Sequence, residues 1–209
     1  EKKRNQVIDN TLKFIYGYPA NNVLLYGDRG TGKSSTVKAL INQYSDLGLR
    51  IIELKKSYLN DFSIIIRELV DYPYKFIIFL DDLSFEEHEI EYKALKAAFE
   101  GGLEAIPSHV LVYATSNRRH IIRESFAERE DDIHKQDTVE EKMSLVDRFG
   151  LQVAFQSPSQ ELYLKIVQKL AQQRELNIDI LQLEKLAIQW ELHHSGRSGR
   201  IATQFIDFL

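Results

Sequence analysis

The chain has 209 residues, a net charge of −4 and no cysteine. Its hydrophobic content of 44% suits a sizeable core, while the acidic balance disfavours a broad electrostatic grip on nucleic acid. The lack of cysteine excludes disulfides, thiol catalysis and cysteine-based zinc sites. No apolar run approaches the length of a membrane span, which favours a cytoplasmic protein without membrane insertion. Because the chain begins on Glu1, we expect it to be a piece of a longer protein.

Apolar runs that suit buried parallel strands alternate with helical patterns through about the first 155 residues. The expected strands span 23–26, 51–54, 76–80, 110–114 and 151–155. Apolar residues at helical spacing lie between them, at Val37, Leu40, Ile41 and Tyr44 and again at Phe62, Ile65, Ile66 and Leu69. This alternation predicts an α/β fold, with a parallel sheet between two layers of helices.

After Ser157-Pro158 the pattern changes to helices alone, expected at about 159–173, 181–193 and 198–208. Proline cannot continue the preceding strand, so this dipeptide is a natural linker. The sequence therefore predicts two domains. They are an αβα core over residues 1–156 and a small helical subdomain over residues 157–209.

The segment Gly27–Ser34 fits G-x-x-x-x-G-K-[S/T], the pattern of a phosphate-binding loop. It follows an expected strand and opens an expected helix, as that loop requires. Glycines let several backbone N–H groups converge on a phosphate, and the helix N-terminus adds its dipole. Lys33 would reach the β- and γ-phosphates, and Ser34 would offer its hydroxyl to Mg²⁺. We expect a nucleoside triphosphate to be bound by Gly27, Asp28, Arg29, Gly30, Thr31, Gly32, Lys33, Ser34 and Ser35.

The expected strand 76–80 ends in two carboxylates, Asp81 and Asp82. A buried parallel strand would deliver Asp81 to the carboxyl edge of the sheet, beside the phosphate loop, to hold Mg²⁺ directly or through water. Asp82 could then orient the attacking water. The alternative is a polar turn in which an aspartate caps the next helix.

Further candidates for the nucleotide site follow the expected strand 110–114, precede the expected strand 151–155 and lie around the start of the last expected helix. Asn117 could hydrogen-bond the attacking water or the γ-phosphate, although asparagine is also an ordinary turn residue. Arg148, just before the fifth strand, could serve a neighbouring subunit's nucleotide, or form an ordinary salt bridge. Arg197 and Arg200, around the start of the last helix, could contact phosphates or be solvated.

These features, in this order, resemble the AAA+ ATPase superfamily. Gly27–Ser34 matches its Walker A motif and residues 76–82 its Walker B motif. Asn117 matches sensor 1, Arg148 the arginine finger and Arg200 sensor 2. The resemblance implies a five-stranded parallel sheet of order 5-1-4-3-2 with a helical lid, and it implies ATP and Mg²⁺ as cofactors. It also implies catalytic roles for Lys33, Asp82, Asn117, Arg148 (in trans) and Arg200, with Ser34 and Asp81 at the metal.

A closer resemblance is to a bacterial family of uncharacterised single-module AAA+ ATPases, described as a domain of unknown function. It rests on residues 19–35, 81–86, 114–120 and 195–200. The chain departs from the wider superfamily at Asp82, where most active members have glutamate. The shorter side chain would fall about 1 Å short of the water, which can cost about 10²-fold in rate. The lid also shows three helices where four are usual.

Two hypotheses for the function follow. The first is an ATPase that forms a homo-oligomer, shares its active site between Lys33 and a neighbour's Arg148, and remodels or loads a protein or nucleic-acid partner. The second is an ATP-dependent switch or loader with little intrinsic hydrolysis, acting on DNA or a DNA-bound complex. Asp82 favours the second, whereas Arg148 and Arg200 favour the first. A small-molecule phosphotransferase is disfavoured, because no acceptor pocket is recognisable.

Two further sets of residues bear on nucleic-acid and metal binding. Arg118, Arg119 and His120 could contact DNA from a loop. The six histidines do not have the spacing of metal ligands, so we expect no zinc site.

Overall fold

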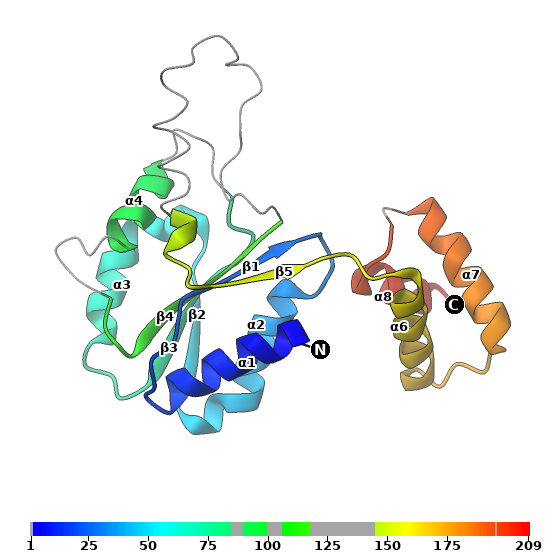
Figure 1. Ribbon diagram of the computed structural model, residues 1–209, viewed down its shortest axis with the longest axis horizontal. Helices are drawn as coiled ribbons and strands as arrows, with labels where there is room; N and C mark the ends of the chain where they lie inside the picture. Colours follow the sequence, from blue (N-terminus) through cyan, green and yellow to red (C-terminus); the bar gives the residue numbers. More distant parts are fainter. Residues whose placement is uncertain (1, 85–89, 100–105, 118–144, 195) are drawn as a thin grey trace, which may run out of the picture. The chain divides into compact units, whose positions relative to one another are not determined.

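The computed structural model describes residues 2–84, 90–99, 106–117, 145–194 and 196–209. The chain forms two compact units (Figure 1), the first made of Glu1–Tyr26 and Ser34–Ala154. The second combines Phe155–Leu209 with the short segment Gly27–Lys33. Most of the predicted phosphate loop therefore belongs to the same compact unit as the helical tail.

The sheet is made of five parallel strands in the order β2-β3-β4-β1-β5. The strands are β1 (Val23–Gly27), β2 (Leu49–Glu53), β3 (Lys75–Leu80), β4 (Val110–Ser116) and β5 (Leu151–Phe155). All five expected strands are present, and the predicted order 5-1-4-3-2 is confirmed. This is the AAA+ form of the P-loop αβα fold.

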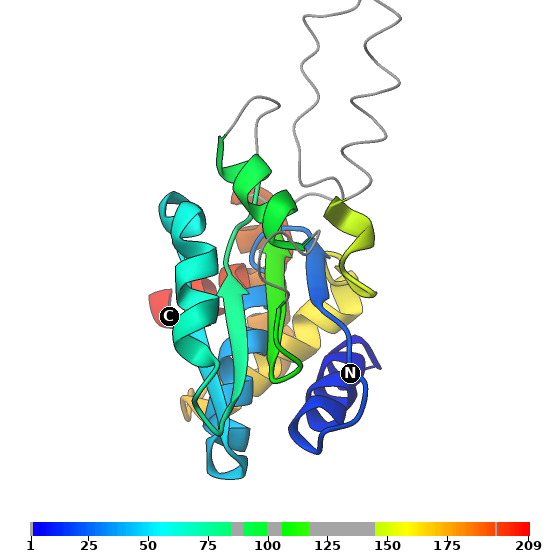
Figure 2. The same cartoon turned by 90° about the vertical axis from the view of Figure 1, so that its left-hand side faces the viewer.

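Helices cover both faces of the sheet, with α3 (cyan) and α1 (dark blue) on opposite sides of the strands in Figure 2. The helices that the structure describes in this part of the chain are α1 (Lys2–Ile15), α2 (Lys33–Tyr44), α3 (Phe62–Leu69) and α4 (Ile90–Phe99), with short 3-10 segments η1 (Ser45–Leu47) and η2 (Lys56–Asp61). Residues Ile77, Ile78 and Phe79 of β3 are fully buried because side chains on both faces are covered. The continuous apolar run of β3 follows from this double burial.

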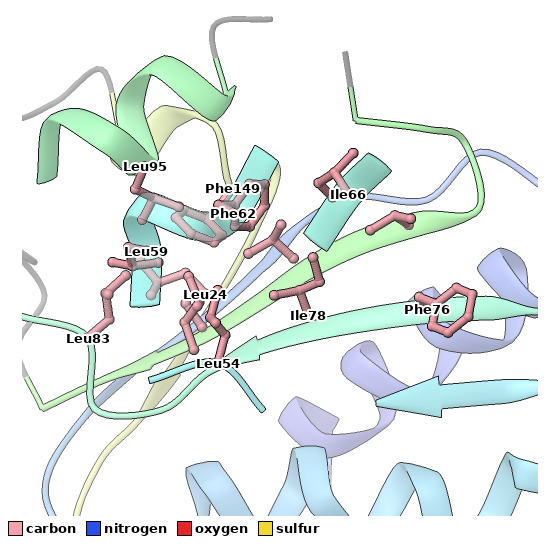
Figure 3. Packing of buried hydrophobic residues seen from close by; sticks show 14 of the residues in the cluster. Leu24, Leu54, Leu59, Phe62, Ile66, Phe76, Ile78, Leu83, Leu95 and Phe149 are labelled. Carbon is pink, nitrogen blue, oxygen red and sulfur yellow. The ribbon is translucent and has the colours of Figure 1, made fainter. Parts of the chain in front are cut away.

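The core on one face of the sheet joins strand residues to η2, α3 and α4 (Figure 3). Leu24 and Ile78 come from the strands, and Phe62 and Leu95 from the helices. Phe149 completes the cluster from the segment before β5, and its ring lies 5.3 Å from that of Phe99. The strand ends are therefore held in fixed positions by a packed core.

Helix α1 is absent from the sequence-based prediction. It buries Val7, Thr11 and Phe14, which lie at i, i+4 and i+7. The Tyr113 hydroxyl of β4 is hydrogen-bonded by Asn10 Nδ2 at 3.0 Å and lies 2.8 Å from Thr11 Oγ1. Buried polar groups on α1 and β4 therefore satisfy one another.

The helical tail contains α6 (Gln160–Gln173), α7 (Ile180–His193) and α8 (Gly199–Phe208), which agree with the predicted helices to within one residue at each end. Side chains of Ser159, Asp179 and Ser198 cap their N-termini by accepting from a backbone N–H three residues on. The core of this tail consists of Tyr163, Val167, Ala171, Leu183, Ala187, Ile201, Ala202, Phe205 and Ile206. Among the described helices, none has the length and apolar character needed to cross a membrane.

Candidate nucleotide-binding site

The predicted phosphate loop joins β1 to α2 through backbone that favours glycine. Gly27, Gly30 and Gly32 have φ angles of +126°, +74° and +91°. A Cβ on Gly27 would lie 2.1 Å from the Phe155 carbonyl oxygen, so only glycine permits that approach. A Cβ on Gly32 would meet nothing within 4 Å, which leaves open space beside the loop.

The side chain of Lys33 lies inside this loop, with 6% of its surface exposed. Its Nζ donates to the carbonyl oxygens of Gly27 at 2.9 Å and Asp28 at 2.7 Å. The first turn of α2 contains no acidic residue. The ammonium and the N-terminal end of α2 therefore give this loop the positive potential that an anion requires.

Ser34, the residue after Lys33, contacts the first carboxylate that follows β3. Ser34 Oγ donates to Asp81 Oδ1 at 2.6 Å. Thr115 Oγ1, from the neighbouring strand β4, donates to the same Asp81 oxygen at 2.6 Å. The sequence predicts that Ser34 and Asp81 lie close together, because parallel strands end at one edge of the sheet. Thr115 was missed, and its position at the end of a strand was the available signal.

Hydroxyl and carboxylate oxygens are the donors that Mg²⁺ takes from proteins. Within the described part of the chain, no group of three or more acidic or histidine side chains could hold a metal. Ser34 and Asp81 alone still suit Mg²⁺, which keeps several waters and completes its shell with substrate phosphates.

Asp82 and Asn117 form a second contact at the same edge of the sheet. Asn117 Nδ2 donates to Asp82 Oδ1, and the Asp82 N–H donates to Thr115 Oγ1 at 2.9 Å. Asp82 has a φ of +53°, in the left-handed region, and such conformations cluster at functional sites. Both side chains are exposed or partly exposed. The predicted water-orienting carboxylate and the predicted sensor amide are therefore in direct contact.

Arg148 lies on the surface after a helical turn over residues 145–147. Its side chain is exposed, whereas the adjacent Phe149 is buried in the core. Asn22 Nδ2 donates to the Arg148 carbonyl oxygen at 3.5 Å. Burial of Phe149 therefore fixes the backbone so that Arg148 faces outward.

The structure separates the two candidate arginines near α8. Arg197 Nε lies 3.0 Å from Oε1 of Glu191, whose side chain is only 10% exposed. Arg200 is exposed, and its backbone N–H donates to the Gly30 carbonyl oxygen at 3.4 Å. Arg200 is thus beside the phosphate loop, while Arg197 is engaged within the helical tail.

Asp28, which the sequence predicts to be part of the nucleotide site, also contacts the segment that follows β5. Its Oδ2 accepts from the Ser157 N–H at 2.7 Å. Hydrogen bonding from Ser157 holds the pKa of the Asp28 carboxyl below its usual range. Arg118, Arg119 and His120, the candidate DNA contacts, lie outside the described residues.

Fold and site geometry define an AAA+ type P-loop protein. A family model described as "Protein of unknown function (DUF815)" matches residues 1–209, so the chain belongs to this family.

Other similarities cover parts of larger proteins. The chain is 40% identical over 71 residues to a 26S proteasome regulatory subunit 4 homolog from Dictyostelium discoideum, a match covering 32% of this chain and 16% of that protein. A RuvB mutant from Thermotoga maritima aligns with a TM-score of 0.65 and 17% identity, over 99% of this chain and 60% of the other. A Thermotoga maritima RuvB structure described as a Holliday junction branch migration motor aligns with a TM-score of 0.53 and 14% identity, over 99% of this chain and 68% of the other. A structure described as a DNA replication initiation factor aligns with a TM-score of 0.58 and 14% identity, over 98% of this chain and 60% of the other. These likenesses show the fold.

Proposed function

We propose that the chain is an ATPase module that binds ATP with Mg²⁺ and couples its nucleotide state to the remodelling or loading of a macromolecular partner. The observation that carries this proposal is the 2.6 Å hydrogen bond from Ser34 to Asp81. It joins the last residue of the phosphate-loop pattern to the carboxylate that ends β3, and this pair suits a metal-bound triphosphate.

Each residue of the site has a role in this proposal. Backbone N–H groups within Gly27–Ser35, apart from that of Asp28, which donates to Phe155, bind the phosphates together with the Lys33 ammonium. Ser34 and Asp81 hold Mg²⁺. When bound, Mg²⁺ neutralises charge on the phosphate oxygens. Asp82 orients the attacking water and accepts its proton, and Asn117 fixes the Asp82 carboxylate in position.

The arginines supply charge from outside the phosphate loop. Arg148 acts in trans on a neighbouring subunit's nucleotide, which its exposure permits. Arg200 acts from the helical lid, and its backbone contact with Gly30 supports that role. The proposal thus includes a homo-oligomer of cytoplasmic subunits, each with a core over 1–156 and a lid over 157–209.

A second candidate is an ATP-dependent switch or loader with little intrinsic hydrolysis. The short Asp82 side chain, held by Asn117, favours this reading because its reach toward a water is limited. DNA or a DNA-bound complex is the partner in this version. It is suggested by two similar structures, whose titles name a Holliday junction motor and a replication initiation factor.

The deciding measurement is the ATP hydrolysis rate per subunit as a function of protein concentration at saturating Mg²⁺. A shared active site predicts a rate that rises with concentration and collapses in Arg148→Ala while nucleotide still binds. Arg67→Ala, which removes another exposed arginine, should leave the rate unchanged. A negligible rate at every concentration, despite tight ATP binding, would establish the switch instead. Absence of nucleotide binding would overturn both versions.

A further inference from the structure

Asp28 is a junction between the phosphate loop and the segment that leads into the lid helices. Its N–H donates to the Phe155 carbonyl oxygen at 2.9 Å. Its own carbonyl oxygen accepts from Thr31 Oγ1 and from Lys33 Nζ, each at 2.7 Å. Its carboxylate accepts from the Ser157 N–H at 2.7 Å. One residue therefore bonds to both the loop interior and the strand-to-helix linker.

The carboxylate of Asp28 has no favourable use toward a phosphate, because two negative groups repel each other. Its bond to Ser157 gives it another role, and this bond is charge-assisted and short. The Asp28 carboxyl is ionised at neutral pH, and hydrogen bonding from Ser157 lowers its pKa further, so the bond has a charged acceptor there. The side chain is exposed and contributes nothing to the core. Its contacts suit positioning of the linker.

Ser157 lies close to the start of α6 in a stiff stretch of chain. Pro158 follows it with a fixed φ and restricts the Ser157 backbone to extended conformations. Ser159 then caps α6, with its side chain accepting from the Leu162 N–H. A displacement of the Ser157 N–H is therefore passed to the first turn of α6 through only two residues.

The second bond between the loop and the helices is longer. It joins the Arg200 N–H to the Gly30 carbonyl oxygen at 3.4 Å and involves no charged acceptor. Charged acceptors give hydrogen bonds about twice as strong as neutral ones. Of these two, the Asp28 bond is the stronger attachment.

We propose that Asp28 is a positioning residue that couples occupancy of the phosphate loop to the start of α6 through its hydrogen bond to Ser157. The proposal rests on the proposed function, since it assumes that the loop binds nucleotide. Lys33 connects bound phosphates to Asp28. Its ammonium donates to the Asp28 carbonyl oxygen and lies where phosphates would be bound.

The test is amide hydrogen exchange at Ser157, followed by NMR without ligand and with Mg²⁺ and AMP-PNP. In the wild type we expect a protected amide whose exchange slows further when AMP-PNP binds. Asp28→Ala removes the acceptor, so exchange without ligand should accelerate about tenfold or more, and the response to AMP-PNP should be lost. Asp28→Asn keeps a neutral acceptor and should retain part of both effects. Asp46→Ala, at another exposed aspartate, should match the wild type.

Nucleotide affinity, measured on the same variants by equilibrium dialysis, separates the possible failures. Unchanged exchange in Asp28→Ala without ligand would overturn the positioning role. Faster exchange with an intact response to AMP-PNP would overturn the coupling alone. Failure of the wild type to bind AMP-PNP would overturn the proposed function and the coupling together. Retained binding in Asp28→Ala with a lost response at Ser157 would support the proposal.

Discussion

The sheet edge of the α/β unit and the core of the helical tail differ in how completely their polar side chains are hydrogen-bonded. At the sheet edge, Ser34 and Thr115 both donate to Asp81, and Asn117 donates to Asp82. In the helical tail, three buried polar atoms have no hydrogen-bond partner within the described residues: Tyr163 Oη, Trp190 Nε1 and Glu191 Oε2. The polar side chains at the sheet edge hydrogen-bond to one another, whereas three buried polar atoms of the tail have no hydrogen-bond partner in the described structure.

This difference leads us to expect a more rigid sheet edge and a less stable helical tail. Side chains fixed by one another on strand ends are preorganised for chemistry, since little rearrangement is needed. Unsatisfied buried groups cost stability, and moving elements are drawn from the less stable parts of a protein. We therefore expect substitutions at the sheet edge to change the chemistry, and substitutions in the tail to change stability and response.

The largest effect on ATP hydrolysis is expected from Asp81→Ala, which removes the carboxylate that accepts from both Ser34 and Thr115. Ser34 and Thr115 lose their shared acceptor, and the candidate metal site loses the Asp81 carboxylate. We expect ATP hydrolysis to fall by about 10²- to 10³-fold, with weaker Mg²⁺-dependent nucleotide binding. Steady-state hydrolysis and binding assays measure both. Asp71→Ala, at an exposed aspartate before β3, is the control, and near wild-type hydrolysis in Asp81→Ala would contradict the assignment.

Asn117→Ala tests whether the amide serves chemistry through Asp82. Loss of a hydrogen bond to a charged acceptor is worth about 1.5–3 kcal/mol, so the hydrolysis rate should fall by about 10- to 100-fold. Nucleotide affinity should stay close to that of the wild type, because Asn117 contacts the carboxylate of Asp82 and lies outside the phosphate-loop pattern. Single-turnover kinetics separate the two quantities. An equal loss in affinity and rate would instead assign Asn117 to ground-state binding.

Gly30→Ala probes the contact between the phosphate loop and α8. A Cβ there would lie 2.7 Å from Ser198 Oγ and 3.1 Å from the Arg200 Cβ. Gly32→Ala is the matched control, since its φ is also positive but its surroundings are open. Both variants carry backbone strain of about 1–3 kcal/mol, so the excess loss in Gly30→Ala isolates the contact. Thermal unfolding followed by the fluorescence of Trp190, the sole tryptophan, measures it, and equal losses would contradict the contact.

Most of the fold could be predicted because the local pattern and the packing agree. The apolar runs of β1, β3 and β4 are largely buried, and Ser159 and Ser198 mark helix starts through side-chain caps. Placement of Asp81 beside Ser34 followed from one rule, that parallel strands end at the same edge of the sheet. The missed helix α1 had a usable signal in Val7, Thr11 and Phe14, at helical spacing.

What could not be predicted depends on contacts between residues distant in sequence. Both Arg197 and Arg200 are candidates near the start of α8, and their contacts distinguish them, because Arg197 pairs with Glu191 while the Arg200 N–H donates to Gly30. The hydrogen bond from the Ser157 N–H to the Asp28 carboxylate joins residues 129 positions apart. No periodicity encodes such pairs, because they follow from how the chain packs.

The smallest effect, and the sharpest test of the comparison, is expected from Tyr163→Phe. The Tyr163 hydroxyl is buried without a hydrogen-bond partner in the described structure, so its removal should be neutral or stabilise the protein by up to about 1 kcal/mol at neutral pH. Tyr113→Phe is the matched change in the α/β unit. There Asn10 and Thr11 would lose their buried partner, at a cost of about 1–3 kcal/mol.

Alkaline pH gives the same pair a second readout. Burial, followed by the nearby Glu191 carboxylate, raises the pKa of Tyr163 to about 12 from an ordinary value of 10.0. The folded protein holds this proton more tightly than the unfolded chain. The resulting stability is present below pH 10 and is lost as the pH rises toward 12. The difference in unfolding free energy between wild type and Tyr163→Phe should therefore shift in favour of the variant above pH 10. A difference that stays constant with pH would mean that Tyr163 is solvated, and the contrast between the two units would then rest on Glu191 and Trp190 alone.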